Sequence, residues 1–438
     1  MTKGVLALTA TNFIYYAGIY VTFGVLQSYA LKRGADPIQI GWIGSAFFLG
    51  ALAARPVGAW LVVRAGRHFT LLAGSLLSAA ACALLPLLTT PARISGGRVL
   101  HGAATALFST SVTLLVADHA PPSRRGEALG VFGASTNAAA AVGPAVGLLL
   151  VHGLGYDWAF GAAVLASFAG AAGAAAMLTP RSTGRERVLI TSETPAGDRL
   201  TGSLAVSSLV IMAFGLTYSV HVGFIVAVAS ARGMEGHVAG LYYTCYAAGI
   251  VTARLVGGRV SDRYGRGWVI APGSLAAALA MVCLSIADGP SVLFAAAVIY
   301  GLGAGSVHPG VLSRMIDLAP APRRGVAVAA FYAAFEIGII VAGPLFGWMV
   351  SRAGYGGSLK VLAIAPAVGV ALYICSTQLR RDELKAGEVL NERIRSRSDG
   401  GRRLGTGAPY LPRRDCDGSG DFRDRGPELG EVGRGTFA

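Results

Sequence analysis

Charged side chains are scarce in this sequence: they make up 14% of its 438 residues, whereas 53% are hydrophobic. A soluble domain has roughly a quarter of its residues charged, so this composition argues against a soluble globular enzyme. Long stretches contain no Asp, Glu, Lys or Arg, and they lie at residues 4–31, 68–91, 128–156, 158–180, 200–231 and 289–313. Each can cross a hydrocarbon core of about 30 Å as a helix of about 20 residues, and each is too long for a barrel strand. The sequence therefore predicts an all-α membrane protein.

Cysteine is also rare, and its five copies show no CxxC or other ligand spacing; they are Cys82, Cys245, Cys283, Cys375 and Cys416. This pattern indicates neither a disulfide framework nor a zinc site. No HExxH or Ser/His/Asp pattern points to an enzyme, and no phosphate-binding loop points to direct use of ATP. We therefore expect no catalytic residues, no metal site and no cofactor.

The apolar stretches predict twelve transmembrane helices, at residues 5–30, 39–63, 69–88, 94–117, 128–151, 158–178, 201–229, 238–260, 268–287, 291–316, 326–350 and 359–378. With the N-terminus inside, the inner segments before the tail carry fourteen Lys and Arg residues, and the outer side carries six. Positive residues accumulate on the cytoplasmic side of membrane proteins. We therefore expect a multi-pass protein of the plasma (cytoplasmic) membrane with both termini in the cytoplasm, and no nucleic-acid partner.

The sequence repeats itself at a spacing of 199 residues. Residues 54–67 align with residues 253–266, and seven of the fourteen positions are identical. The same spacing relates further pairs: Arg33-Gly34 and Arg232-Gly233, Asp118 and Asp317, Pro121 and Pro320, and residues 124–126 and 323–325. A repeat of six helices that starts on the same side each time predicts two parallel six-helix bundles related by an axis along the membrane normal.

Composition changes mark the boundaries of these bundles. We expect one bundle at residues 1–178 and the other at 201–378, joined by a polar cytoplasmic linker at 179–200. Residues 379–438 contain thirteen Lys or Arg and eleven Asp or Glu residues, with almost no apolar periodicity. Such a segment cannot bury enough apolar surface to fold, so we predict a disordered cytoplasmic tail.

A short motif lies in the loop between the second and third helices of each half. In the second half it reads Gly258-x-x-x-Asp262-Arg263-x-Gly265-Arg266, and in the first half Arg64, Gly66 and Arg67 remain while Val63 replaces the acidic residue. The motif resembles the loop signature of the major facilitator superfamily. In that family the loop forms a cytoplasmic gate, so the resemblance implies a charge latch built from Asp262, Arg263, Gly265, Arg266, Arg64, Gly66 and Arg67.

Two further motifs extend the resemblance over residues 1–378. Arg98-x-x-His101-Gly102 resembles the fourth-helix arginine motif of the family, with histidine where glutamine is common. The fifth-helix antiporter motif is matched at Gly130, Gly143, Pro144 and Gly147, with Ala139 and Leu148 where glycines are usual. The resemblance implies a twelve-helix transporter of the drug or metabolite proton antiporter type, similar to bacterial arabinose-efflux permeases.

Ionisable groups within a membrane helix are costly and usually functional. Glu336 is the one carboxylate well inside a predicted helix, and its partner at the repeat spacing is Asn137. We expect both side chains to face a central cavity and Glu336 to carry the coupled proton; a structural pairing of Glu336 with a nearby arginine is the alternative. Arg98 and His101 lie one helical turn apart, and we expect them to bind an anionic group or to assist proton coupling.

A small-molecule cavity also needs amphipathic polar groups, and the candidates are Asn12, Tyr15, Tyr16, Asn137, Tyr218, His308 and Tyr332. We expect His308-Pro309-Gly310 to interrupt the tenth helix.

These observations predict a monomeric, proton-coupled exporter of a small organic compound that works by alternating access. A symporter that imports a sugar or organic acid is the first alternative, and a transporter-like receptor or scaffold is the second. The sequence does not identify the substrate.

Overall fold

The computed structural model describes residues 2–121, 124–176, 202–320 and 323–375, and nearly all of them are helical, without any strand. The predicted linker at 179–200 and the predicted tail at 379–438 lie outside these described residues, as does the side chain of Asp262. The helices are α1 (Lys3–Lys32), α2 (Pro37–Ala65), α3 (Arg67–Leu84), η1 (Leu85–Leu87), α4 (Pro91–His119), α5 (Arg125–Gly153), α6 (Tyr156–Ala176), α7 (Gly202–Gly223), α8 (Ile225–Ser230), α9 (Gly236–Tyr264), α10 (Gly267–Ser285), α11 (Pro290–Leu318) and α12 (Arg324–Leu362), followed by a last helix at 364–375.

These helices correspond to the twelve predicted spans. The predicted seventh span is α7 and α8 together, separated at Phe224. The long helix α12 contains two spans, because the backbone leaves the helical region at Gly354 (φ 66°). Within the described residues, nine stretches are long and apolar enough to cross a membrane, and one of these, Arg324–Cys375, includes both of those spans. Helices α6 and α9 complete the twelve.

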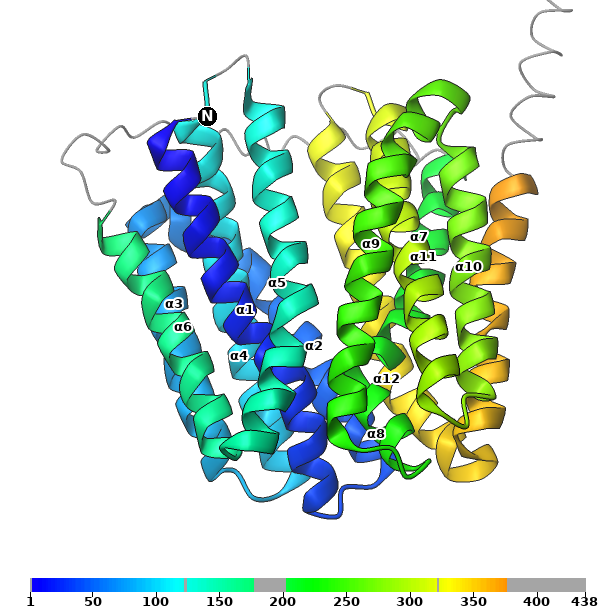
Figure 1. The fold of residues 1–438 in the computed structure, drawn as a ribbon. Helices are drawn as coiled ribbons and strands as arrows, with labels where there is room; N and C mark the ends of the chain where they lie inside the picture. The colour runs from blue at the N-terminus through cyan, green and yellow to red at the C-terminus, as the bar shows by residue number, and fades with distance from the viewer. Residues whose placement is uncertain (1, 122–123, 177–201, 321–322, 376–438) are drawn as a thin grey trace, which may run out of the picture. The chain divides into compact units, whose positions relative to one another are not determined.

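The helices form two bundles that share one packing pattern (Figure 1). In the first bundle α2 packs against α4 and α1 against α5; in the second, α9 packs against α11 and α7 against α12. Each pair in the second bundle is the repeat equivalent of a pair in the first. The repeat in the sequence is therefore a repeat in the fold.

One expectation about the tenth span was wrong. Helix α11 runs without a break through His308, Pro309 and Gly310. A proline within a helix removes a single backbone hydrogen bond, and neighbouring helices can hold such a helix together in a membrane.

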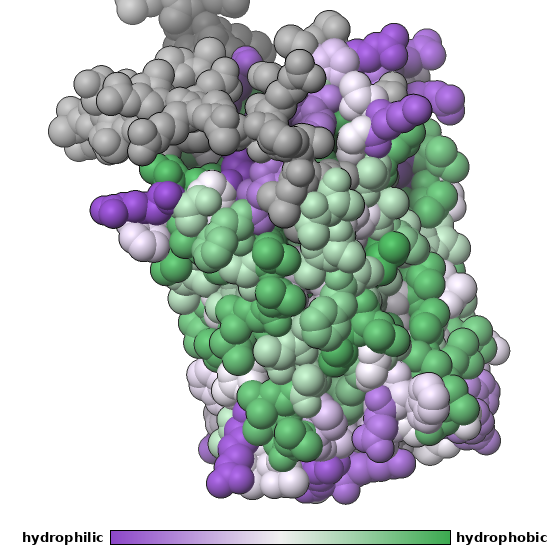
Figure 2. All heavy atoms as spheres, turned by 90° about the vertical axis from the view of Figure 1, so that its left-hand side faces the viewer, coloured by the Kyte–Doolittle hydropathy of each residue, from purple (hydrophilic) through white to green (hydrophobic). Residues whose placement is uncertain are grey.

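The middle of the molecule presents apolar side chains to its surroundings. Figure 2 shows hydrophobic residues across the central part of the first bundle and hydrophilic residues at both ends. On α6, for example, Trp158, Leu165 and Phe168 are all at least half exposed. A soluble protein rarely leaves so much contiguous apolar surface uncovered, so this belt is the surface that meets the hydrocarbon core.

The chain turns at two opposite faces. We call the face where α1 begins the terminal face. The opposite face, which holds the α1–α2 and α8–α9 connections, is the distal face. Gly66 and Gly265, one repeat apart, turn the chain at the terminal face with φ values of 88° and 95°. Only glycine adopts such angles without strain, which explains why both copies of the loop motif keep this residue.

The two bundles meet closely near the distal face. There α2 crosses α12 at Gly41 and Gly343, whose absent side chains let the two backbones touch, and the Ser45 hydroxyl donates to the Ile339 carbonyl oxygen at 3.1 Å. Helix α5 contacts α9 in the equivalent arrangement, with Gly240 beside Ala145. Toward the terminal face the bundles diverge (Figure 1). The structure is thus closed at the distal face.

Candidate functional site

An ion pair joins the two bundles at Arg55 of α2 and Glu336 of α12. The Arg55 guanidinium contacts both carboxylate oxygens, Nη2 bonding to Oε1 and Nε to Oε2 at 3.3 Å. The Glu336 side chain is 8% exposed and that of Arg55 is 40% exposed. Two-point contact by a guanidinium is the strongest form of a carboxylate pair. The pairing of Glu336 with an arginine, which the sequence offered as the alternative to a proton-carrying role, is therefore present, and that arginine belongs to the other bundle.

Aromatic side chains lie around this pair. The Arg55 guanidinium is 5.7 Å from the ring centre of Tyr332, one turn before Glu336 on α12. The His308 ring packs edge-on against Phe331 at 4.8 Å and Phe335 at 5.3 Å. Tyr332 and His308 are both half-buried, and their ring centres lie 6.1 Å apart, so these two predicted cavity residues are neighbours.

Arg98 and His101 form a separate network inside the first bundle. Arg98 Nη1 donates to Thr22 Oγ1 at 3.1 Å and lies 3.2 Å from His101 Nδ1. His101 Nε2 lies 3.5 Å from the Cys82 sulfur. Both Arg98 and His101 are buried, and the two side chains are in contact, as their one-turn spacing predicts. Among the described residues, no hydrogen bond or ion pair links them to Glu336 or Arg55.

The remaining predicted cavity residues divide into packed and half-buried groups. Asn12 is fully buried and donates to Ser135 and Thr136 at 2.9 and 2.8 Å, and Tyr15 stacks on Phe108 at 3.6 Å. These two hold α1 against its own bundle. Half-buried side chains are found at Tyr16, Asn137 and Tyr218.

Asn137 and Glu336 have different partners in spite of their repeat relationship. Asn137 donates to the Gly133 carbonyl oxygen of its own helix at 2.6 Å, whereas Glu336 reaches across to Arg55. Tyr218 of the second bundle belongs to the same apolar cluster as Tyr16 and Tyr20 of the first. Aromatic rings of the two bundles therefore pack into one cluster.

The loop motifs at the terminal face make matching ion pairs in the two halves. Arg67 pairs with Asp118, and Arg266 Nε pairs with Asp317 Oδ2 at 3.2 Å. The two arginines are one repeat apart, and so are the two aspartates. Arg266 also donates to Ser261 at 2.9 Å. The first-half pair forms although Val63 replaces the acidic residue of the motif.

The other members of the motif lie at the surface. Arg64 and Arg263 are exposed and extend over the rings of Trp60 and Tyr264. The Asp262 side chain lies outside the described part of the chain, so its predicted latch stays a prediction.

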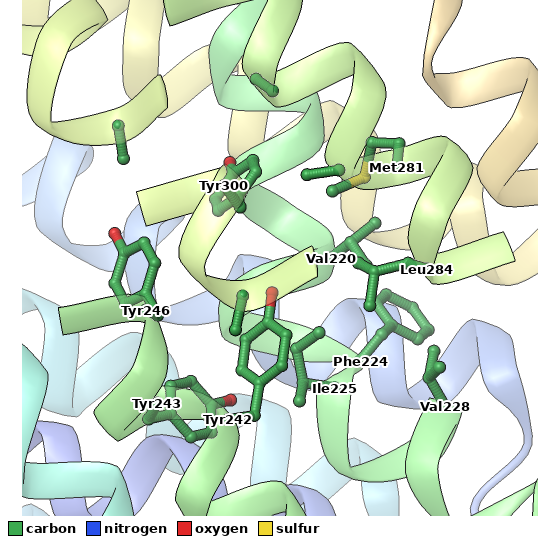
Figure 3. Close-up of a cluster of buried hydrophobic side chains, with 14 of the residues drawn as sticks. Val220, Phe224, Ile225, Val228, Tyr242, Tyr243, Tyr246, Met281, Leu284 and Tyr300 are labelled. Atoms are coloured by element: carbon green, nitrogen blue, oxygen red, sulfur yellow. The ribbon is translucent and has the colours of Figure 1, made fainter. Parts of the chain in front are cut away.

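Sequence reasoning missed a cluster around His221 on α7. Its buried ring lies 3.8 Å from the ring centre of Tyr246, and its Nδ1 lies 3.4 Å from the Tyr242 hydroxyl. Tyr243 donates to the His221 carbonyl oxygen at 3.0 Å. Figure 3 shows Tyr242, Tyr243, Tyr246 and Tyr300 gathered here.

The repeat could have revealed this cluster. At a spacing of 199, His221 corresponds to Thr22, Tyr246 to Phe47 and Tyr300 to His101, which together surround Arg98. The two bundles thus contain polar clusters at equivalent positions, and only the first includes a permanent charge among the described side chains.

Metal ligation has no basis in the part of the chain that the structure describes. There, no three His, Cys, Asp or Glu side chains lie close enough to hold an ion.

Comparison with known proteins agrees with the fold. The family profile described as Major Facilitator Superfamily matches residues 8–206 and 207–404. An uncharacterized MFS-type transporter of Burkholderia mallei is 24% identical over 386 residues, covering 85% of this chain and 91% of its own. The methylenomycin A resistance protein of Streptomyces coelicolor is also 24% identical, covering 82% and 88%.

Among solved structures, a bacterial homolog to the human lysosomal transporter Spinster, in an inward-facing and unoccupied conformation, superposes with a TM-score of 0.71. Its identity is 16%, over 86% of this chain and 98% of that one. This likeness shows the fold. Because the family profile matches both halves of the chain, this protein is a member of the major facilitator superfamily, a transporter and not an enzyme.

Proposed function

We propose that this transporter exports a small organic compound across the plasma (cytoplasmic) membrane in exchange for protons. The observation that carries the proposal is the Arg55–Glu336 pair between the bundles. Neutralising the nearly buried Glu336 removes the charge that holds the half-exposed Arg55 guanidinium. Protonation of Glu336 therefore weakens the contact between α2 and α12, and a bound proton changes which arrangement of the bundles is favoured.

The excess of Lys and Arg on one side sets the orientation of the protein in the membrane for the proposed cycle. With both termini in the cytoplasm, the distal face is extracellular and the terminal face is cytoplasmic. The state described above is then inward-open, with Glu336 ionised and bound to Arg55. In the outward-open state the α2–α12 crossing separates, and Glu336 takes up a proton from the extracellular side.

The name of one relative supports export over import. A protein at 24% identity is named a methylenomycin A resistance protein, and removal of a toxic compound from the cell is a direct route to resistance. We propose that the substrate contacts the half-buried polar groups near the ion pair, namely Tyr16, Asn137, Tyr218, His308 and Tyr332. Asn12 and Tyr15, which are fully buried in the first bundle, position α1. The transporter acts as a monomer.

Transport direction tests the proposal. In everted membrane vesicles, acidifying the lumen should drive uptake of the substrate, which is first identified by growth protection of cells that express the protein. Uptake driven only by the opposite gradient would instead establish a symporter. Transport retained after deletion of residues 385–438 would count against a receptor or scaffold that acts through its tail.

A further inference from the structure

Arg98 is a buried cation whose described partners are all neutral. Its side chain is 1% exposed, its Nη1 contacts Thr22 and His101, and its Nε has no hydrogen-bond partner. A guanidinium does not lose its proton in a protein, and a buried charge is costly unless it is paired. The network around Arg98 therefore lacks a counter-charge.

The described carboxylates do not supply one. In the first bundle they stand at helix ends, at Asp36, Asp118, Glu127 and Asp157, and Glu336 is bound to Arg55. Arg98 lies seven residues into α4 from the distal face, and Glu336 lies twelve residues into α12 from the terminal face. At 1.5 Å per residue these depths are about 10 Å and about 18 Å from opposite ends, so the two charged sites are at different levels.

A cavity of about 10 Å³ beside Arg98, room for about one water molecule, lies in the seam between the bundles. Since both bundles contribute walls, the cavity is complete only while the distal face is closed, and its mostly apolar lining strengthens any charge pairing inside it. The walls are Phe23, Gln27, Ile40 and Ile43 from the first bundle and Val222 and Gly223 from the second.

We propose that a carboxylate group binds Arg98 at this cavity, which widens to admit it, and that the transported compound carries that carboxylate. The planar guanidinium fork matches a carboxylate in shape. Its orientation is fixed, because the Arg98 guanidinium carbon lies 4.3 Å from the ring centre of Phe23 and 4.5 Å from that of Phe47. Assignment of the carboxylate to the cargo rests on the proposed transport function; the anion site itself does not.

Nuclear magnetic resonance on the purified full-length protein tests the site with two probes. Saturation-transfer signals report weak binding of acetate, and line broadening of ³⁵Cl reports chloride. We expect acetate to give a saturable signal and its neutral analogue acetamide to give none. Arg98→Gln should reduce the acetate signal at least fivefold, and Arg98→Lys, which keeps the charge, should retain part of it.

Arg314→Gln is the matched control, because Arg314 is also a membrane arginine and bonds to the Tyr373 hydroxyl; it should bind acetate as the wild type does. Glu336→Gln should also bind acetate as the wild type does. Loss of proton coupling at Glu336 can therefore be told apart from loss of anion binding at Arg98. An equal acetate signal in wild type and Arg98→Gln, or no acetate signal in either, would overturn the proposal. Saturable chloride binding that acetate does not displace would assign the cavity to an inorganic anion and overturn the carboxylate assignment.

Discussion

The side chain of Gln27 accepts a hydrogen bond at 3.1 Å from the backbone N–H of Val226, the residue one repeat later in the sequence. The same amide donates to the Val222 carbonyl oxygen at 2.6 Å. These two backbone groups flank the break between α7 and α8 at Phe224, and an unbroken α-helix would bond them to each other. Gln27 thus supplies hydrogen-bond partners to both backbone groups at the break, and it joins the two bundles near the distal face.

Gln27→Leu should loosen this closure. Two buried backbone groups would lose their partner, at a cost of about 1–3 kcal/mol each, and states open at the distal face would become more populated. A cysteine placed at Ile43 in the seam should then react at least tenfold faster with an impermeant maleimide added from the distal side. Ser45→Ala, which removes one hydrogen bond of the same seam, should have a smaller effect. Unchanged reactivity in Gln27→Leu would show that the closure does not depend on this amide.

Gly343→Ala should hinder the same closure by overlap. A Cβ atom on Gly343 would lie 2.5 Å from the Gly41 carbonyl oxygen, a backbone atom that cannot move aside cheaply. Overpacking of this kind costs about 1–3 kcal/mol. Transport should fall severalfold, whereas Gly130→Ala, at a position of the fifth-helix motif in the first bundle with open space around it, should transport normally. Equal rates for the two variants would argue against a close α2–α12 crossing during the cycle.

The segment Gly143-Pro144-x-x-Gly147 recurs as Gly343-Pro344-x-x-Gly347, and the two copies explain part of what the sequence could not predict. Gly143 packs against Ala17 and Tyr20 of α1, whereas Gly343 packs against Gly41 and Ser45 of α2. The repeat spacing slips from 199 to 200 residues before this motif. One residue turns a helix by about 100°, so the second copy faces the other bundle and the first faces its own.

The helices themselves were predictable because charge-free stretches and basic loops follow from the cost of charge in lipid. The break at Phe224 was not, since the sequence is apolar on both sides of it and the group that satisfies it, Gln27, is far away in the chain. The partner of Glu336 was hidden for a related reason. Arg55 lies 281 residues earlier, and a sequence does not give the rotation of one helix against another.

Topology provides an independent prediction. Reporter fusions after residues 190 and 400 should report a cytoplasmic location, and a fusion near residue 354 should report the exterior, because Lys and Arg are more than twice as frequent on the proposed inner side. Alkaline phosphatase and green fluorescent protein fusions at each site measure this. A cytoplasmic signal at residue 354 would contradict the orientation used in the proposed cycle.

The gate motif predicts an asymmetric effect at the terminal face. Asp262→Asn should raise the accessibility of cytoplasmic-side cysteines, because a charged contact of about 1–2 kcal/mol would be lost when the face closes. Val63→Asn, at the equivalent position of the first half, should change it little. Equal labelling in the two variants would show that both halves carry the latch alike.

Glu336→Gln tests the central claim most directly, because glutamine keeps the shape and hydrogen-bonding capacity of the side chain but cannot ionise. Moving one charge across the membrane is worth about 2.3 kcal/mol per 100 mV, and each pH unit adds about 1.4 kcal/mol; without a titrating group this energy cannot reach the substrate. In proteoliposomes, substrate-induced proton movement and uphill transport should disappear in Glu336→Gln while substrate exchange without a gradient continues, and Glu336→Asp should keep part of the coupling. If Glu336→Gln still moves protons with substrate at the wild-type ratio, Glu336 is a structural residue, and His101 or His308 must be tested as the proton carrier instead.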